Sequence, residues 1–175
     1  MQLDIVIPCF NEEEVLRNTH LRVRNILEEV KSKKLINDFK IIYVNDGSKD
    51  GTFDILDEFS QKDPSVKALS FSRNFGHQAA LSAGLKFLRG DAVISLDADL
   101  QDPPELIENM LLRFHEGFEI VYGVHLVREN DTFFKRTSAT LFYKLMQWLG
   151  VTIVPHHAEF RLISRQVYRR LFVRH

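Results

Sequence analysis

Short apolar runs alternate with amphipathic stretches along the chain, and this alternation is the feature that most restricts the fold. The apolar runs are continuous rather than broken by polar residues, which is typical of strands buried on both faces. Strands and helices that alternate at this spacing predict a mainly parallel sheet flanked by helices. We therefore expect one Rossmann-like α/β domain over residues 1–175, with strands at 3–8, 39–46, 66–72, 91–98 and 119–126 and helices at 12–33, 51–62, 77–90 and 103–117.

The composition agrees with one globular domain that has a sizeable core. The chain has 175 residues, of which 45% are hydrophobic and 27% are charged, and these values fit a soluble folded protein. Its single cysteine, Cys9, excludes an internal disulfide and fits a reducing compartment. We expect no signal peptide, because the first apolar run is short and contains Asp4. No stretch approaches the roughly 20 apolar residues that span a bilayer.

Charge is distributed unevenly along the chain. The net charge of −1 argues against a nucleic-acid partner. Residues 125–175, however, contain nine Lys and Arg against three Asp and Glu, a net charge of +6, whereas residues 1–124 carry a net charge of −7. An acidic first part and a basic second part indicate either two tasks on one domain or chance clustering on solvated faces.

Polar residues follow each of the first four predicted strands. Open α/β sheets bind ligands beyond the carboxyl ends of their strands, and these ends read PCFNEEE, NDGSKDG, SRNFGHQ and DADLQD. Any one of them can be an ordinary turn. Four polar ends along one edge favour a binding site there.

The stretch VISLDADLQDPPELI, residues 93–107, places acidic residues close together at one such end. A metal ion, a basic side chain or plain solvent can accommodate their repulsion. If the strand continues through Asp99, Asp97 and Asp99 point to the same side, and Gln101 continues the series. Oxygen ligands without a nearby Cys or His cluster suit Mg²⁺ or Mn²⁺, which complete their shells with water and phosphate. We therefore expect a nucleoside diphosphate ligand, with a solvated acidic turn as the alternative.

Four motifs, IVIPCFNEEE, VNDGSKDGT, SRNFGHQAALSAGL and DADLQDPPELI, resemble in their order and spacing the family 2 glycosyltransferases of the GT-A fold. Within that family the chain most resembles the polyisoprenyl-phosphate glycosyltransferases, the group of dolichol-phosphate mannose synthase and bacterial undecaprenyl-phosphate glucosyltransferases. The resemblance extends through YGVHLVREND and HHAEFRLISR. It implies an inverting, metal-dependent hexosyltransferase that uses Mg²⁺ or Mn²⁺. The donor would be a nucleoside-diphosphate sugar and the acceptor an undecaprenyl or dolichyl phosphate.

The same resemblance implies roles for individual residues. The expected nucleotide-binding residues are Pro8, Phe10, Asn11, Glu12, Asp46, Asp97 and Asp99. The expected metal ligands are Asp99 and Gln101, the expected catalytic residues are Asp99, Glu159 and Arg128, and the expected acceptor-phosphate contacts are Arg128 and Arg161. Glu159 stands where many relatives have Asp, so that its role as a base or as an orienting group stays open. His125 stands where relatives often have Arg.

Residues 132–150 would form an amphipathic helix with Phe134, Phe142 and Leu145 near one face and basic residues beside it. Such a helix can lie in a membrane interface or pack on the core, and its periodicity favours neither. The resemblance favours the membrane surface. Relatives usually continue into transmembrane helices, so we expect a catalytic domain cut before such helices, at the cytoplasmic face of a membrane. Whether it forms a homo-oligomer stays open.

Other functions predict different sequence features. A family 2 enzyme with a saccharide acceptor stays open, although the QxxRW motif of processive polysaccharide synthases is absent. A sugar-phosphate nucleotidyltransferase needs a glycine-rich basic loop after the first strand, where this chain has the acidic PCFNEEE. A nucleotide-binding or receiver module without transferase activity, the latter with Asp46 as phosphoacceptor, leaves DADLQD unexplained.

Overall fold

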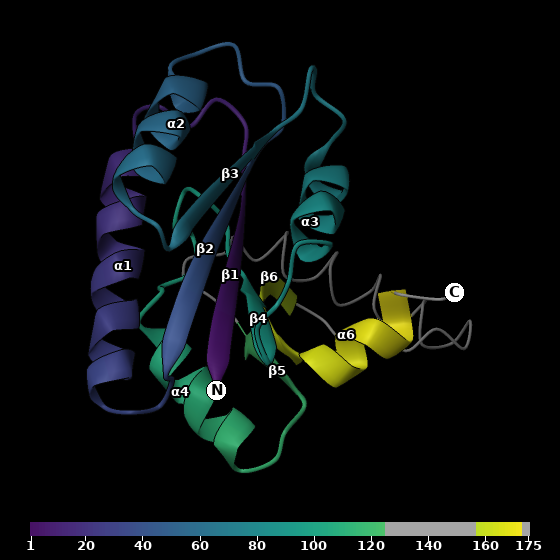
Figure 1. Cartoon of the computed structure of the whole chain (residues 1–175). Helices are drawn as coiled ribbons and strands as arrows, with labels where there is room; N and C mark the ends of the chain where they lie inside the picture. Colours follow the sequence, from purple (N-terminus) through teal and green to yellow (C-terminus); the bar gives the residue numbers. More distant parts are fainter. Residues whose placement is uncertain (125–156, 173–175) are drawn as a thin grey trace, which may run out of the picture.

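The structure is a computed structural model that describes residues 1–124 and 157–172 (Figure 1). These residues form a six-stranded sheet in the order β3-β2-β1-β4-β6-β5. Strands β1 to β4 are mutually parallel, whereas β6 runs antiparallel to both β4 and β5. The strands are β1 (Gln2–Cys9), β2 (Asp38–Asn45), β3 (Val66–Ser70), β4 (Ala92–Ser95), β5 (Ile120–Val124) and β6 (His157–Ser164). The predicted α/β fold with a mainly parallel sheet is thus confirmed.

Helices cover both faces of the sheet. The helices are α1 (Leu16–Ser32), α2 (Thr52–Lys62), α3 (His77–Leu85), α4 (Leu106–His115) and α6 (Arg165–Phe172). In Figure 1, α1, α2 and α4 lie on one side of the sheet, and α3 and α6 lie on the other. The buried side chains form one cluster on each side, and β1 contributes to both. The central strand is therefore buried on both faces, as its continuous apolar sequence predicts.

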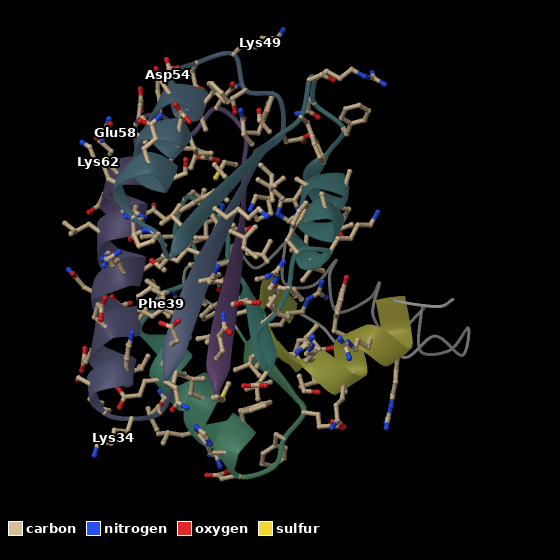
Figure 2. The ribbon with its side chains drawn as sticks, viewed as in Figure 1. Lys34, Phe39, Lys49, Asp54, Glu58 and Lys62 are labelled. Atoms are coloured by element: carbon tan, nitrogen blue, oxygen red, sulfur yellow. The ribbon has the colours of Figure 1, made fainter. Side chains whose placement is uncertain are left out.

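The outer helices are amphipathic, as their sequence periodicity predicts. On α1, the buried residues recur every three or four positions, and they are Leu16, Thr19, Val23, Leu27 and Val30. On α2, Glu58 and Lys62 lie on the outward face (Figure 2) and form an ion pair of 2.8 Å. Hydrogen bonds from Arg17 and Lys62 lower the pKa of Glu58 to about 2. Such exposed pairs contribute little to stability, so the apolar face is what attaches these helices.

Strand β6 was not predicted from the sequence. It lies between β4 and β5, pairing Ile94 with Leu162 and Val121 with the same leucine. Phe160 and Leu162 are completely buried and join the core beneath α1 and α4. Because β6 is antiparallel to both neighbours, β5 keeps the direction of β4 even though the two strands do not touch.

Several predicted elements end earlier than expected, and α3 is one of them. Helix α3 ends at Leu85 instead of residue 90. The buried carboxylate of Asp4 accepts hydrogen bonds from the backbone N–H groups of Arg89 and Gly90, both at 2.7 Å. The N–H groups of Lys86, Phe87 and Leu88 bond three residues back in tight turns, and Asp4 then holds the chain where it enters β4. The predicted helix at 132–150 lies outside the described residues.

Candidate active site

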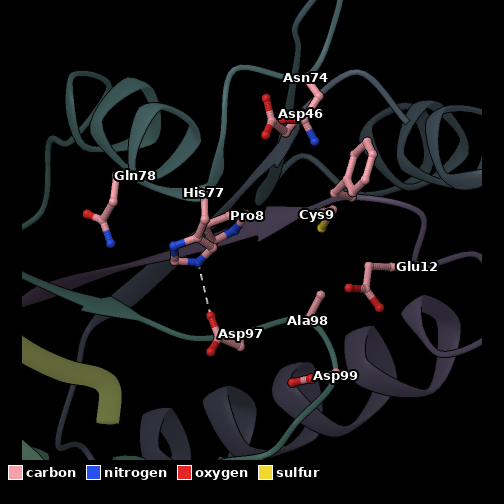
Figure 3. A pocket seen from close by; sticks show the side chains of 11 residues that line it. Pro8, Cys9, Glu12, Asp46, Asn74, His77, Gln78, Asp97, Ala98 and Asp99 are labelled. Atoms are coloured by element: carbon pink, nitrogen blue, oxygen red, sulfur yellow. Dashed lines mark hydrogen bonds and ion pairs between the residues drawn. The ribbon is translucent and has the colours of Figure 1, made fainter. Parts of the chain in front are cut away.

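A pocket of about 450 Å³ lies at the carboxyl edge of the parallel strands (Figure 3). All four polar strand ends contribute to it. Its lining residues are Pro8, Cys9, Phe10, Glu12, Asp46, Asn74, His77, Gln78, Asp97, Ala98 and Asp99. In the view of Figure 3, Asp46 and Asn74 lie at one end and Asp97 and Asp99 at the other, with His77 between them. Its size suits a ligand of small-molecule dimensions.

The acidic pair Asp97 and Asp99 occupies a turn instead of the expected end of a strand. Strand β4 stops at Ser95, and Leu100 has a left-handed φ of +53°. Ala98 is buried between the two acids, and its carbonyl accepts a 2.6 Å hydrogen bond from the hydroxyl of Thr19 on α1. The expectation that strand alternation aligns the two carboxylates was therefore wrong. A turn anchored through Ala98 brings both to the pocket.

Gln101 contacts Asp99 directly. Its backbone N–H and its side-chain Nε2 donate to the two carboxylate oxygens of Asp99, at 3.2 and 2.6 Å. Gln101 itself does not line the pocket. Gln101 therefore orients Asp99, and its expected role as a metal ligand stays a prediction.

Negative charge accumulates at the acidic end of the pocket. Burial, followed by repulsion from Asp99, Asp50 and Asp97, raises the pKa of Glu12 above its ordinary value. Among the described lining residues, only His77 can carry a positive charge. A cation bound near these carboxylates would relieve their mutual repulsion.

The carboxylates fit a divalent cation that also binds a ligand. Within residues 1–124 and 157–172, no group of three or more His, Cys, Asp or Glu side chains is arranged to hold a metal by itself. Mg²⁺ and Mn²⁺ prefer oxygen ligands, and Mg²⁺ commonly takes one or two carboxylates together with substrate phosphates. The pair Asp97 and Asp99 therefore suits such an ion only when phosphate oxygens and water complete its shell.

At the opposite end, Asp46 is deeply buried, with 2% of its surface exposed. One carboxylate oxygen accepts the N–H of Phe75 at 2.7 Å and the other accepts the N–H of Gly76 at 2.9 Å. Asp46 therefore fixes the segment between β3 and α3. This segment supplies Asn74, and the first turn of α3 adds His77 and Gln78. The sequence motif SRNFGHQ indicated a polar strand end, but it did not reveal which of its residues line the pocket.

Hydrogen bonds join the loop after β1 to the loop after β2. Asn11 donates its N–H to the hydroxyl of Ser48, and its side-chain oxygen accepts the N–H of Lys49. The remaining loop contacts are Glu12 N–H to Thr52 Oγ1, Glu13 N–H to Asp50 Oδ2 and Gly51 N–H to Glu13 Oε2. The side chain of Asn11 thus holds the neighbouring loop, and Asn11 does not line the pocket.

The residues expected on the acceptor side are described only in part. Arg128 and His125 lie outside the described residues, and Glu159 is described only as part of the backbone of β6. Arg161 lines a small cavity with Leu81 and Leu85 of α3 and is not among the residues that line the main pocket. Their expected roles stay predictions.

A mainly parallel sheet with an Asp-x-Asp turn beside a pocket at its carboxyl edge is the arrangement of the GT-A glycosyltransferases. The family model for Glycosyl transferase family 2 matches residues 4–172. The chain belongs to glycosyltransferase family 2.

Curated relatives resemble almost the whole chain. The uncharacterized glycosyltransferase YkoT of Bacillus subtilis (strain 168) is 46% identical over 172 residues, which cover 97% of this chain and 51% of the relative. The bactoprenol glucosyl transferase of Shigella phage SfX is 39% identical over 172 residues, covering 98% of this chain and 55% of the relative. The chain spans about half the length of the curated relatives it matches.

Solved structures share the fold at lower identity. The mannosyltransferase PcManGT from Pyrobaculum calidifontis, solved with GDP-Man and Mn²⁺, has a TM-score of 0.64 and 18% identity and matches 97% of this chain and 46% of its own. Glucosyl-3-phosphoglycerate synthase from Mycobacterium tuberculosis, solved with UDP, has a TM-score of 0.58 and 22% identity, covering 95% and 57% of the two chains. At these identities the likeness is one of fold.

Proposed function

We propose that this chain is the catalytic domain of a glycosyltransferase that moves a hexose from a nucleoside-diphosphate sugar to a polyprenyl phosphate. The observation that carries the proposal is the pocket with Asp46 at one end and Asp97 and Asp99 at the other. The acceptor class is supported by the bactoprenol glucosyl transferases, which are 38–39% identical over 98% of the chain.

The donor would lie along the pocket. In this proposal Pro8, Phe10 and Asp46 would contact the nucleoside, and the Asp97–Asp99 turn would face the diphosphate; all five residues line the pocket. Glu12 lines the pocket near the acidic turn, and burial, followed by the negative charge of the neighbouring acids, raises its pKa.

The reaction requires that negative charge on the departing diphosphate be stabilised. Asp99, oriented by Gln101, and Asp97 would hold a Mg²⁺ or Mn²⁺ ion, which supplies Lewis-acid stabilisation of that charge when bound. The acceptor phosphate has a second ionisation near pH 6 and is mostly deprotonated at neutral pH. It therefore needs little general-base help, and we assign Glu159 an orienting role as much as a basic one.

The basic second part of the sequence would serve the acceptor. Arg128 and Arg161 are the proposed phosphate contacts, and residues 132–150 the proposed membrane-surface segment. In the portion of the chain that the structure describes, no helix has both the length and the apolarity to cross a bilayer. The basic and aromatic residues of segment 132–150 would supply the contact with the cytoplasmic face of the membrane.

A binding screen followed by a transfer assay tests the proposal. Calorimetry with UDP-, GDP- and dTDP-sugars, each with Mn²⁺ or with EDTA, identifies the donor. We expect one base to be preferred and binding to weaken in EDTA. The chosen donor is then offered a short-chain prenyl phosphate and, separately, a saccharide acceptor. Transfer to the saccharide alone would identify a family 2 enzyme of another acceptor class, and no binding of any nucleotide sugar would refute the proposal.

A further inference from the structure

The segment that connects β3 to α3 touches both ends of the pocket. At one end, the buried carboxylate of Asp46 accepts the N–H groups of Phe75 and Gly76. At the other end, His77, the first residue of α3, places its Nε2 atom 3.2 Å from Oδ1 of Asp97 (Figure 3). A continuous chain of contacts therefore leads from the end of β2 to the acidic turn after β4.

The backbone of this segment is closely constrained. Gly76 has a φ of +94°, which L-amino acids with a side chain rarely adopt, and its N–H also lies 3.0 Å from the side-chain oxygen of Asn74. Gly47 has a φ of +66° and packs closely on the backbone of Arg73. A Cβ added at Gly47 would lie 2.3 Å from the carbonyl carbon of Arg73. The path that carries His77 to Asp97 is thus set by the end of β2 and the loop that follows it.

We propose that His77 is a positioning residue that holds Asp97 for the donor diphosphate, and that Asp46 acts on the same carboxylate by fixing the segment that carries His77. An ionised carboxylate can only accept, so Nε2 of His77 is the donor in this contact. An imidazole can make this bond as a neutral group, whereas Lys or Arg would neutralise Asp97 and compete with a cation. The inference rests on the proposed function, since Asp97 faces a diphosphate only if the donor is a nucleotide sugar.

This inference changes the expected role of Asp46. If Asp46 only contacts the nucleobase, its replacement weakens nucleotide binding and leaves the affinity for free pyrophosphate unchanged. If it positions His77 and Asp97, Asp46→Asn weakens the binding of pyrophosphate as well, because Asn retains only one carbonyl oxygen for the two N–H donors of Phe75 and Gly76. The two roles thus differ in a quantity that calorimetry measures.

The central experiment is a double-mutant cycle on the contact between His77 and Asp97. Calorimetry measures the affinity of His77→Ala, Asp97→Asn and the double variant for UDP, GDP and pyrophosphate in the presence of Mn²⁺. We expect His77→Ala to weaken binding about tenfold, as for the loss of one hydrogen bond to a charged group, and to add less than twofold in the Asp97→Asn background. His77→Gln, whose amide nitrogen can donate, should recover most of the affinity. His115→Ala, which removes an exposed imidazole on α4 bonded to a carbonyl, is the matched control and should bind normally.

A second measurement needs no ligand, so that failure of the inference and failure of the proposed function can be told apart. The ¹⁵N NMR spectrum of the imidazoles should show that Nε2 of His77 is protonated in the free chain, and this signal should shift in Asp97→Asn. An unprotonated Nε2, or additive losses in the double variant, would overturn the positioning role. If the free chain shows the expected ¹⁵N signal but binds no nucleotide, the contact stands and the proposed function fails.

Discussion

The hydroxyl of Thr19 on α1 donates a 2.6 Å hydrogen bond to the carbonyl of Ala98, between the two aspartates of the acidic turn. Both residues are buried. This contact links a core-facing position of a helix directly to the geometry of the candidate site. Strand β4 ends before this turn, so strand alternation does not position Asp97 and Asp99. The bond to Thr19 explains how both can still reach the pocket.

Removing that hydroxyl should affect both stability and binding. Thr19→Val keeps the shape of the side chain but leaves the Ala98 carbonyl unsatisfied, at a cost of about 1–3 kcal/mol in the free energy of unfolding. We also expect weaker Mn²⁺-dependent nucleotide binding, because the turn is less well held. Urea unfolding and calorimetry measure the two effects. Thr19→Ser retains the donor and is the control, and equal losses in both variants would contradict this account.

Asp99→Asn tests the proposed cation site. The substitution removes one of the two carboxylate charges offered to the ion while leaving the buried parts of the turn unchanged. We expect the Mn²⁺-dependent part of nucleotide binding to disappear and the fold to remain intact. Titration with UDP or GDP in Mn²⁺ and in EDTA measures the difference. Unchanged metal dependence in this variant would argue that the ion binds elsewhere.

Glu12→Gln should stabilise the protein at neutral pH. Burial and the neighbouring acids raise the pKa of Glu12 in the folded state, so the folded protein binds more protons than the unfolded chain between the unfolded and folded pKa values. The wild type therefore loses stability as pH rises through that interval. Denaturant unfolding at about pH 4 and about pH 7 measures this effect. The free energy of unfolding of Glu12→Gln should exceed that of the wild type at the higher pH, and the difference should shrink at the lower pH.

His20 should give the opposite pH dependence. Its ring stacks on Phe59 at 4.1 Å between centroids and bonds to the hydroxyl of the buried Tyr43. Burial, with a smaller effect from Arg24, lowers the pKa of His20. The folded protein then binds fewer protons than the unfolded chain, so stability is lost as pH falls from the unfolded pKa toward the folded one. His20→Gln should remove this dependence of the free energy of unfolding on pH. If the dependence persists in His20→Gln, His20 is not its source.

Arg128→Ala tests the acceptor side. If Arg128 binds the acceptor phosphate, the substitution should reduce sugar transfer by about ten- to a hundredfold, as for the loss of one charge-assisted contact. Nucleotide-sugar affinity should remain near that of the wild type. Initial rates with a short-chain prenyl phosphate, compared with calorimetry of the donor, separate the two effects. Arg113→Ala, on α4 and paired only with Glu116 in the described contacts, is the control.

The sequence predicted the parallel part of the sheet well because the central strands β1, β2 and β4 are mostly apolar and buried. It did not predict β6, whose neighbour β4 lies some sixty residues earlier in the chain. Local periodicity cannot report which strand inserts between two others. The same limit applies to the chain between α3 and β4, because it is held by Asp4, a residue of β1 that becomes its neighbour only in the folded chain.

The site was predicted more completely in its residue types than in its contacts. Pro8, Phe10, Glu12, Asp46, Asp97 and Asp99 all line the pocket, as the motifs indicated. His77 and Asn74 were quoted within a motif but received no role, because their importance comes from distances to Asp46 and Asp97 across the pocket. A motif identifies which groups are present, but it does not identify which of them hold one another.

The hydrogen bonds between the loops after β1 and β2 have a consequence for the thermodynamics of ligand capture. Backbone donors at Asn11, Glu12, Glu13, Lys49 and Gly51 are already engaged within the protein. The conformational entropy of these residues is therefore lost during folding and does not have to be lost again when a nucleotide arrives. The loop that carries Glu12 to the pocket is thus already ordered before a ligand binds.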